Sequence, residues 1–259
     1  ILIANEKVSF REGNSVGKEF KRTLKENGTY TREDFLHAAA KLGGFYVPSF
    51  YTVSYNEQRR NPNWVAYELT AEEVAGTVKR GDDFVRDPLV IGRQADDSDY
   101  RKSGWDRGHI APAADMKWSE QAMDESFYLS NVSRQIGNLN RGVWKSIEEL
   151  TRDNAQRYGE ILVVTGPVFT NKKGLGYIGD NRVIIPNGFY KVLLAYDNGY
   201  TGIGFYCENV AGKKKLSTYA KSIDEIENIT GIDFFHLLPD EIEDEIEIRY
   251  DWNDWETGK

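Results

Sequence analysis

The chain has 259 residues, 40% of them apolar and 29% charged, a composition typical of a soluble globular protein that can bury a sizeable core. No apolar run approaches the roughly 20 residues that a membrane-spanning helix needs, which excludes a transmembrane protein. The single cysteine, Cys207, excludes an internal disulfide, and with three histidines a Cys/His zinc site is nearly excluded too, so any metal would be held largely by oxygen.

Charge is distributed unevenly along the chain. The net charge is −8, but Asp224 to Lys259 holds 13 acidic and 2 basic residues, so residues 1–223 carry a net charge of +3. The overall acidity therefore does not exclude a nucleic-acid partner, whose phosphates are bound by Lys and Arg. The acidic run 241–247 is typical of a solvated helix or strand face or of a soft terminus, and a tail that repels competing polyanions is the alternative.

The first predicted element is a helix over 35–42, which follows a helix-start pattern at 31–34 and ends at Gly43-Gly44. Helical spacing predicts two further helices, over 119–123 and 143–158. Short segments rich in β-branched and aromatic residues predict strands at 63–69, 161–164, 183–185, 190–196 and 203–206. Strands before and after a central helical segment predict a mixed α+β domain.

One main domain is expected, because no internal repeat and no Pro/Gly/Ser-rich linker divides the chain. We expect residues 1–60 to be an N-terminal extension packed on this domain, residues 61–240 to form the domain, and residues 241–259 to form an acidic C-terminal tail. The chain begins at Ile1 rather than Met, which we interpret as a mature or trimmed product.

The region from Trp105 to Arg152 concentrates side chains that catalysis uses. His109 follows Gly108 and precedes 110–112, so we expect its imidazole at a strand end or turn, open to a substrate. Downstream, Asn140 at a helix start offers a neutral oxygen ligand.

Each of these residue types also has a purely structural interpretation. A lone histidine is often structural, and Asn131, Asn138 and Asn140 are residues typical of turns and helix caps. Glu148 and Arg152, one helical turn apart, could form a surface ion pair worth a few tenths of a kcal/mol. The spacing of eight residues to Glu148 distinguishes Asn140 from the other two asparagines.

These residues, taken together, resemble the DNA/RNA non-specific endonucleases, the ββα-metal nucleases. The resemblance covers residues 62–238 and rests on several motifs in the same order and spacing, which is far more specific than any one of them alone. The motifs are Asp106-Arg107-Gly108-His109, Ser119 to Asp124, Phe127 to Asn131, Gln135, Asn140, Trp144 and Glu148. The resemblance implies a mixed sheet core carrying a ββα-metal active-site motif.

The resemblance also implies roles around a metal ion. His109 matches the family's general base, which takes a proton from the attacking water. Asn140 matches the direct protein ligand of Mg²⁺, for which Mn²⁺ can substitute, and Glu148 matches the residue that orients metal-bound water. With an unperturbed pKa of about 6.5 for His109, activity is expected to fall below about pH 6.5.

Further residues match positions near the scissile phosphate. Arg107 and Arg152 match family arginines that pair with phosphate oxygens, and Asn131 matches an active-site asparagine. One more family arginine, upstream of the histidine motif, aligns ambiguously with residues 80–87: Arg80 and Arg86 are both candidates, and Asp82 in the arginine's place is the alternative. Absence of that arginine would lower the reaction rate without changing the reaction class.

We therefore predict a Mg²⁺-dependent endonuclease that cuts DNA and RNA with little sequence preference and leaves 5′-phosphate ends. Contacts to phosphate and metal position a duplex without reading base edges. A DNA-restricted endonuclease and a catalytically silent nucleic-acid-binding relative are the alternatives, whereas an adhesin or carbohydrate-binding protein has no need of this arrangement. No membrane partner is expected, and the sequence leaves the oligomeric state open, a homodimer included. The missing initiator Met and the similarity to exported bacterial nucleases predict a secreted or periplasmic location.

Overall fold

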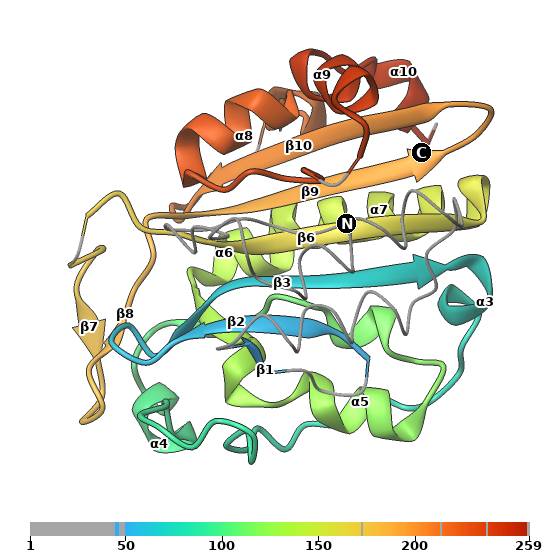
Figure 1. Ribbon diagram of the computed structural model, residues 1–259. Helices are drawn as coiled ribbons and strands as arrows, with labels where there is room; N and C mark the ends of the chain where they lie inside the picture. Colours follow the sequence, from blue (N-terminus) through green and yellow to red (C-terminus); the bar gives the residue numbers. More distant parts are fainter. Residues whose placement is uncertain (1–44, 47–49, 172, 213, 237, 258–259) are drawn as a thin grey trace, which may run out of the picture.

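The computed structural model describes residues 45–46, 50–171, 173–212, 214–236 and 238–257. Its centre is a seven-stranded sheet in the order β1-β2-β3-β6-β9-β10-β11, in which every pairing is antiparallel (Figure 1). The strands of this sheet are β1 (Phe45–Tyr46), β2 (Thr52–Asn56), β3 (Asn61–Thr70), β6 (Glu160–Val168), β9 (Gly188–Tyr196), β10 (Tyr200–Glu208) and β11 (Ala220–Lys221).

Two small strand pairs and several helices complete the described part of the chain. The pairs are β4 (Asp106–His109) with β5 (Val132–Gln135), and β7 (Tyr177–Ile178) with β8 (Val183–Ile184). The helices are α3 (Ala71–Val74), α4 (Asp97–Tyr100), α5 (Glu120–Ser126), α6 (Gly137–Leu139), α7 (Lys145–Tyr158), α8 (Ile223–Thr230), α9 (Asp240–Ile248) and α10 (Trp252–Trp255). Within the described ranges, none of them has the length and apolar composition needed to cross a membrane.

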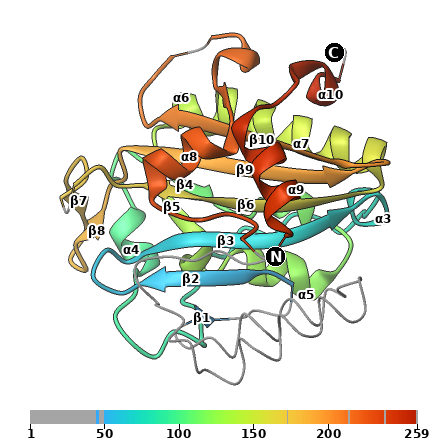
Figure 2. The same ribbon diagram turned by 45° about the horizontal axis from the view of Figure 1, so that its top comes forward.

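Helices cover both faces of the central sheet. Figure 2 shows α8 and α9 on one side of the strands and α7 on the other. Successive side chains of a strand point to opposite faces, so Val163 of β6 packs in the cluster under α7 while Val164 packs with α8. Burial on both faces explains why β9 is buried from Gly188 to Ala195.

The expected α+β architecture is confirmed, but the expected mixed sheet core is not, because every pairing of the described central sheet is antiparallel. The predicted strands at 63–69, 161–164, 190–196 and 203–206 lie inside β3, β6, β9 and β10, and the helix predicted at 143–158 is α7 with the turn that precedes it. Helix α5 ends three residues later than the segment predicted at 119–123. The helix expected at 35–42, with His37, lies outside the described residues.

Structural elements lie on both sides of the two expected boundaries. Strand β2 pairs with β3 in the central sheet, so residues 52–56, expected in the N-terminal extension, lie in the same sheet as residues 61–70. The acidic C-terminal segment is not a soft terminus, because Ile246 and Trp255 are buried and Asn154 of α7 donates its Nδ2 hydrogen to the Trp255 carbonyl at 2.9 Å. Apolar residues at helical spacing among the acids anchor this segment, and only the outward carboxylates stay solvated.

Candidate active site

The candidate site is built on the pair β4–β5 and the helical segment that follows it. His109 is the last residue of β4 and faces Val132 of β5 in the antiparallel register, as expected for a strand end. After β5 the chain passes through α6 and a π-helical turn, Asn140–Trp144, into α7. Asn140 starts that turn and Glu148 lies on α7, and a kink with non-helical backbone dihedrals at Gly142 separates these two predicted metal-site residues.

His109 lies in an aromatic pocket with its imidazole almost fully buried. Its ring centroid is 4.8 Å from that of Phe127 and 5.2 Å from that of Phe84. The side chain is 7% exposed, and its Nε2 is buried without a hydrogen-bond partner among the described residues. This burial differs from the expectation of an imidazole open to a substrate, because the rings of Phe84 and Phe127 pack against it. The Nε2 atom nevertheless remains a proton acceptor that no described group uses.

Burial and the nearby charge of Arg80 lower the pKa of His109 to about 3. The imidazole is therefore neutral throughout the ordinary working range. For an unperturbed histidine, protonation would reduce activity below about pH 6.5. With the lowered pKa of His109, this loss of activity is expected only at far lower pH. Any loss of activity just below neutrality reports another group, and the half-buried Glu148 is the first candidate.

The buried His109 also makes stability depend on pH. Its pKa is lower in the folded than in the unfolded chain, so below about pH 6.5 the unfolded chain takes up a proton that the folded chain does not, and stability is lost as pH falls. We expect wild type to lose about 2 kcal/mol more than His109→Gln between pH 7.5 and pH 5. Urea unfolding of both proteins at each pH measures this difference, and parallel losses would contradict the buried neutral histidine.

Asn140 is oriented by an acidic partner on β4. Its Nδ2 donates a hydrogen bond to Asp106 Oδ2 at 3.0 Å, and Arg141 forms an ion pair with the same carboxylate oxygen. Since the amide nitrogen is committed to Asp106, the amide oxygen Oδ1 points away from that partner and remains available as a ligand. Asp106 belongs to the motif that ends at His109, but the sequence analysis predicted no function for its side chain.

Glu148 is half-buried on α7 and surrounded by charges of both signs. Burial and Asp115 raise its pKa, while Lys191, Arg152 and Arg80 act in the opposite direction. Lys191 is fully buried on β9, with Nζ 5.5 Å from the centroid of the Trp144 ring, and burial lowers its pKa. A lysine inside the otherwise apolar strand 188–196 is a sequence signal for a buried charge that our sequence analysis missed.

Arg152 is held in place by a second buried acid. Its Nη1 donates to Asp115 Oδ1 at 2.7 Å, and the Tyr67 hydroxyl donates to the other oxygen of Asp115 at 2.7 Å. Asp115 is 1% exposed, so this pair is shielded from water and rigid. Arg152 keeps further N–H groups for a ligand. The surface ion pair with Glu148, considered above as the structural alternative, is not among the ion pairs of the described residues.

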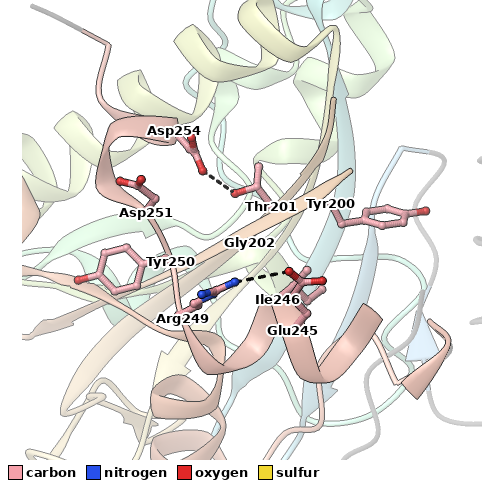
Figure 3. Close-up of a pocket in the computed structure, with 9 residues that line it drawn as sticks. All are labelled: Tyr200, Thr201, Gly202, Glu245, Ile246, Arg249, Tyr250, Asp251 and Asp254. Carbon is pink, nitrogen blue, oxygen red and sulfur yellow. Dashed lines mark hydrogen bonds and ion pairs between the residues drawn. The ribbon is translucent and has the colours of Figure 1, made fainter. Parts of the chain in front are cut away.

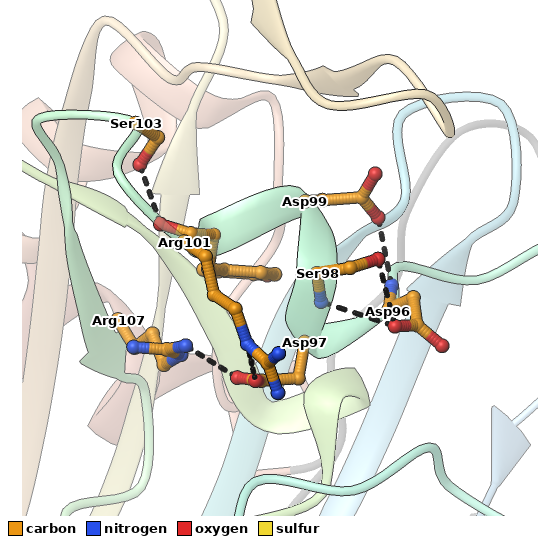
Figure 4. A network of polar contacts seen from close by, with 8 residues as sticks. Asp96, Asp97, Ser98, Asp99, Arg101, Ser103 and Arg107 are labelled. Atoms are coloured by element: carbon orange, nitrogen blue, oxygen red, sulfur yellow. Dashed lines mark hydrogen bonds and ion pairs between the residues drawn. The ribbon is translucent and has the colours of Figure 1, made fainter.

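Arg107 lies on β4, two residues before His109, and is held by an acidic residue. It forms an ion pair with Asp97 of α4, and this carboxylate also accepts from Arg101 at 3.0 Å (Figure 4). The Arg107 guanidinium lies 5.2 Å from the centroid of the Phe84 ring, which in turn contacts His109. Arg107 therefore lies next to the histidine pocket, with its charge only partly compensated.

The structure distinguishes between the two upstream arginines. The Arg80 guanidinium lies 5.2 Å from the centroid of the Phe127 ring, and its charge acts on both His109 and Glu148. Arg86 instead acts on Asp96, outside this group of residues. Arg80 is thus the upstream arginine beside the candidate site.

Asn131 differs from the other predicted site residues because its side chain is fully engaged with the backbone. Its Oδ1 accepts from the Ala111 amide at 2.8 Å, and its Nδ2 donates to the carbonyls of Ala111 and Ser126, both at 2.9 Å. The side chain is fully buried. Asn131 thus fixes the segment that directly follows His109.

Comparison with known proteins identifies the family that carries these motifs. The model of the DNA/RNA non-specific endonuclease family matches residues 42–241. The chain belongs to this family. The resemblance inferred from the motifs between Asp106 and Glu148 is thereby confirmed.

Individual relatives agree with this assignment. The chain is 40% identical to human mitochondrial endonuclease G over 154 residues (56% of this chain, 52% of that protein). It is 36% identical to zebrafish (Danio rerio) mitochondrial nuclease EXOG over 222 residues (76% of this chain, 65% of that protein). A crystal structure of the EndoG/EndoGI complex, described as explaining EndoG inhibition, superimposes with a TM-score of 0.74 at 30% identity, covering 83% of this chain and 95% of that chain.

The relatives correct one expectation. A secreted or periplasmic location was predicted partly from similarity to exported nucleases, but the human and zebrafish relatives, and a yeast (Saccharomyces cerevisiae) relative 33% identical over 208 residues, are named mitochondrial nucleases. The prediction was therefore wrong. The chain spans 52–65% of the length of these three relatives.

Proposed function

We propose that this protein is a metal-dependent endonuclease that hydrolyses phosphodiester bonds in both DNA and RNA, with little sequence preference. Membership of the DNA/RNA non-specific endonuclease family supports the reaction class. The observation that carries the proposal is a neutral His109 with an unpaired Nε2 on β4, the strand that also carries Asp106, which orients the amide of Asn140. A proton acceptor and an oxygen ligand on one strand–strand–helix unit are what metal-assisted hydrolysis requires.

We assign β4, β5 and the helical segment through α7 as the ββα-metal motif. The residues fit a hard divalent cation such as Mg²⁺, because the donor set is oxygen only: the free Oδ1 of Asn140 as direct ligand and the Glu148 carboxylate acting through water. When bound, such an ion stabilises charge on the phosphoryl oxygens and lowers the pKa of its water.

The chain's own residues supply the remaining steps. His109 Nε2 accepts the proton of the attacking water as the oxygen approaches phosphorus, and burial keeps this nitrogen unprotonated beforehand. Arg107, Arg152 and Arg80 pair with phosphate oxygens, where a planar guanidinium donates two parallel hydrogen bonds. Asn131 acts as a positioning residue, since its amide is committed to the backbone around Ala111.

The division of the chain also remains a proposal. We assign the endonuclease domain to the sheet from β1 onward and retain an N-terminal extension for the residues before it. Formation of a homodimer stays a prediction. The acidic helix α9 is assigned to the domain itself because Ile246 packs on the sheet.

The direct test is digestion of supercoiled plasmid and of single-stranded RNA, each with Mg²⁺ and with EDTA. We expect both polymers to be cut, EDTA to abolish cleavage, and the ends to carry 5′-phosphate, detected by ligation without kinase treatment. Cleavage of DNA alone would identify the DNA-restricted alternative. Duplex binding by folded protein without cleavage would identify the silent relative and contradict the proposal.

A further inference from the structure

A cluster of five carboxylates lies on the face of the sheet opposite α7. Asp224 and Glu227 come from α8, Glu243 and Glu247 from α9, and Asp233 from the segment between these helices. Ligand oxygens of Asp224, Glu227 and Glu247 lie within 4.8 Å of one another, and so do those of Asp233, Glu243 and Glu247. Glu247 therefore joins the two groups, and we call the five residues the α8–α9 acidic cluster.

One carboxylate oxygen of Glu247 is buried without a hydrogen-bond partner among the described residues. The residue is 8% exposed, and its Oε1 has no hydrogen-bond partner among the described residues. Glu243 Oε1 is buried and unpaired in the same way. A surface acidic patch keeps its oxygens in water, whereas these two oxygens have lost water and gained no donor, which is costly unless something else occupies the space between them.

The cluster repels itself when all its members are charged. Burial and the neighbouring carboxylates raise the pKa of Glu227 and of Glu243 to about 7 and that of Glu247 to about 8. The charged groups that act most strongly on Glu247 are all acids: Glu227, Glu243, Asp224 and Asp233. At neutral pH the protein must therefore protonate some of these groups or neutralise them with a cation.

The lysine that precedes α8 and the arginine that follows α9 are engaged elsewhere. Lys221 pairs with Glu225 at 2.9 Å, and Arg249 pairs with Glu245 on the far side of α9, at the edge of a separate cavity (Figure 3). Within the described ranges, the Phe234 amide donates a hydrogen bond of 2.7 Å to Glu227 Oε1. One backbone N–H cannot compensate five carboxylates.

We propose that the α8–α9 acidic cluster binds a Ca²⁺ ion, separate from the metal of the candidate active site, and that this ion ties α8 to α9. Ca²⁺ takes six to eight oxygen ligands in flexible geometry, which suits carboxylates from three chain segments, whereas Mg²⁺ requires a near-ideal octahedron and retains its waters. The site is across the sheet from α7, so the proposal does not depend on the proposed nuclease activity.

The test uses EDTA-treated full-length protein carrying Asn140→Ala, so that the candidate active site contributes little metal binding. Calorimetric titration with CaCl₂ should show one site. Ca²⁺ at about 100 times its Kd should raise Tm by about 5–10 °C. Glu247→Gln in the same background should weaken Ca²⁺ binding at least tenfold and, at the same Ca²⁺ concentration, reduce the rise in Tm by about half or more. Its Tm in EDTA should equal or exceed that of the parent, because one repulsive charge has been removed.

Glu245→Gln is the matched control, since it removes a carboxylate from the same helix but on its exposed side, and it should bind Ca²⁺ like the parent. If Glu247→Gln does not fold, Glu243→Gln takes its place with the same expected losses. The proposal is overturned if the parent shows no Ca²⁺ binding up to about 5 mM, well above the weakest physiological sites. Equal binding by the parent and Glu247→Gln would overturn it as well.

Discussion

His109→Gln is expected to lower kcat by about 10²–10⁴-fold on both DNA and RNA while leaving duplex affinity unchanged. Glutamine is similar in size and polar, but it cannot take a proton from water. The imidazole Nε2 of wild type is buried, unpaired and neutral, so its loss removes a base and no hydrogen bond within the described structure. Initial rates with Mg²⁺ measure the loss, and fluorescence anisotropy with labelled duplex in EDTA measures binding.

The control for this variant is its folding, followed by circular dichroism and by Tm at pH 7.5, where the histidine is neutral in both folded and unfolded chains. If His109→Gln keeps activity within tenfold of wild type, His109 is not the general base. Because burial lowers the pKa of His109 to about 3, wild-type activity retained at pH 5 agrees with that role. Without the structure, the same result would have counted against it.

Asn140→Ala is expected to lower kcat/KM by about 10²–10³-fold at a fixed, low Mg²⁺ concentration, because the amide oxygen is the one direct protein ligand that we assign to the metal. Raising the metal concentration should recover part of the loss. Asp106→Ala should act in the same direction but more weakly, about 10–100-fold in metal affinity, because it frees the Asn140 amide to rotate.

The matched control is Asn138→Ala, which removes an exposed amide two positions away on the same helical segment. It should leave the metal dependence unchanged. The dependence of rate on Mn²⁺ concentration, together with Mn²⁺ binding measured by electron paramagnetic resonance, separates a metal effect from a general loss of structure. Equal metal dependence in Asn140→Ala and Asn138→Ala would contradict the assignment of Asn140.

The candidate site combines a general base that is buried away from solvent with polar and charged side chains that acidic partners hold in place. Asp106, Asp97 and Asp115 each accept from a residue proposed to act on the metal or the phosphate: Asn140, Arg107 and Arg152 respectively. An arginine or amide held by a buried or half-buried carboxylate loses little conformational entropy when the substrate arrives. The positioning residues are therefore as much a part of the site as the groups that touch phosphate.

Sequence periodicity predicted the long, strongly patterned elements and missed the short ones. Strands such as β3 and β9 are rich in β-branched and aromatic residues, and helix α7 shows helical spacing of apolar residues. Strand β4, by contrast, consists of Asp106 to His109, whose polar composition resembles a turn, and its pairing with β5 comes from residues 23 or more positions away. Pairings between distant segments leave no local pattern in the chain.

Motif order and spacing around His109, Asn140 and Glu148 were enough to identify the family and the candidate catalytic residues, because both are properties of the chain alone. The folded arrangement was needed to show that Arg80 is the upstream arginine beside the site, that Asn131 is committed to the backbone, and that the histidine is neutral. It also decided that Glu247 meets carboxylates of α8. Burial and through-space charge depend on which segments the fold brings together, and these two quantities set each pKa and each free ligand atom.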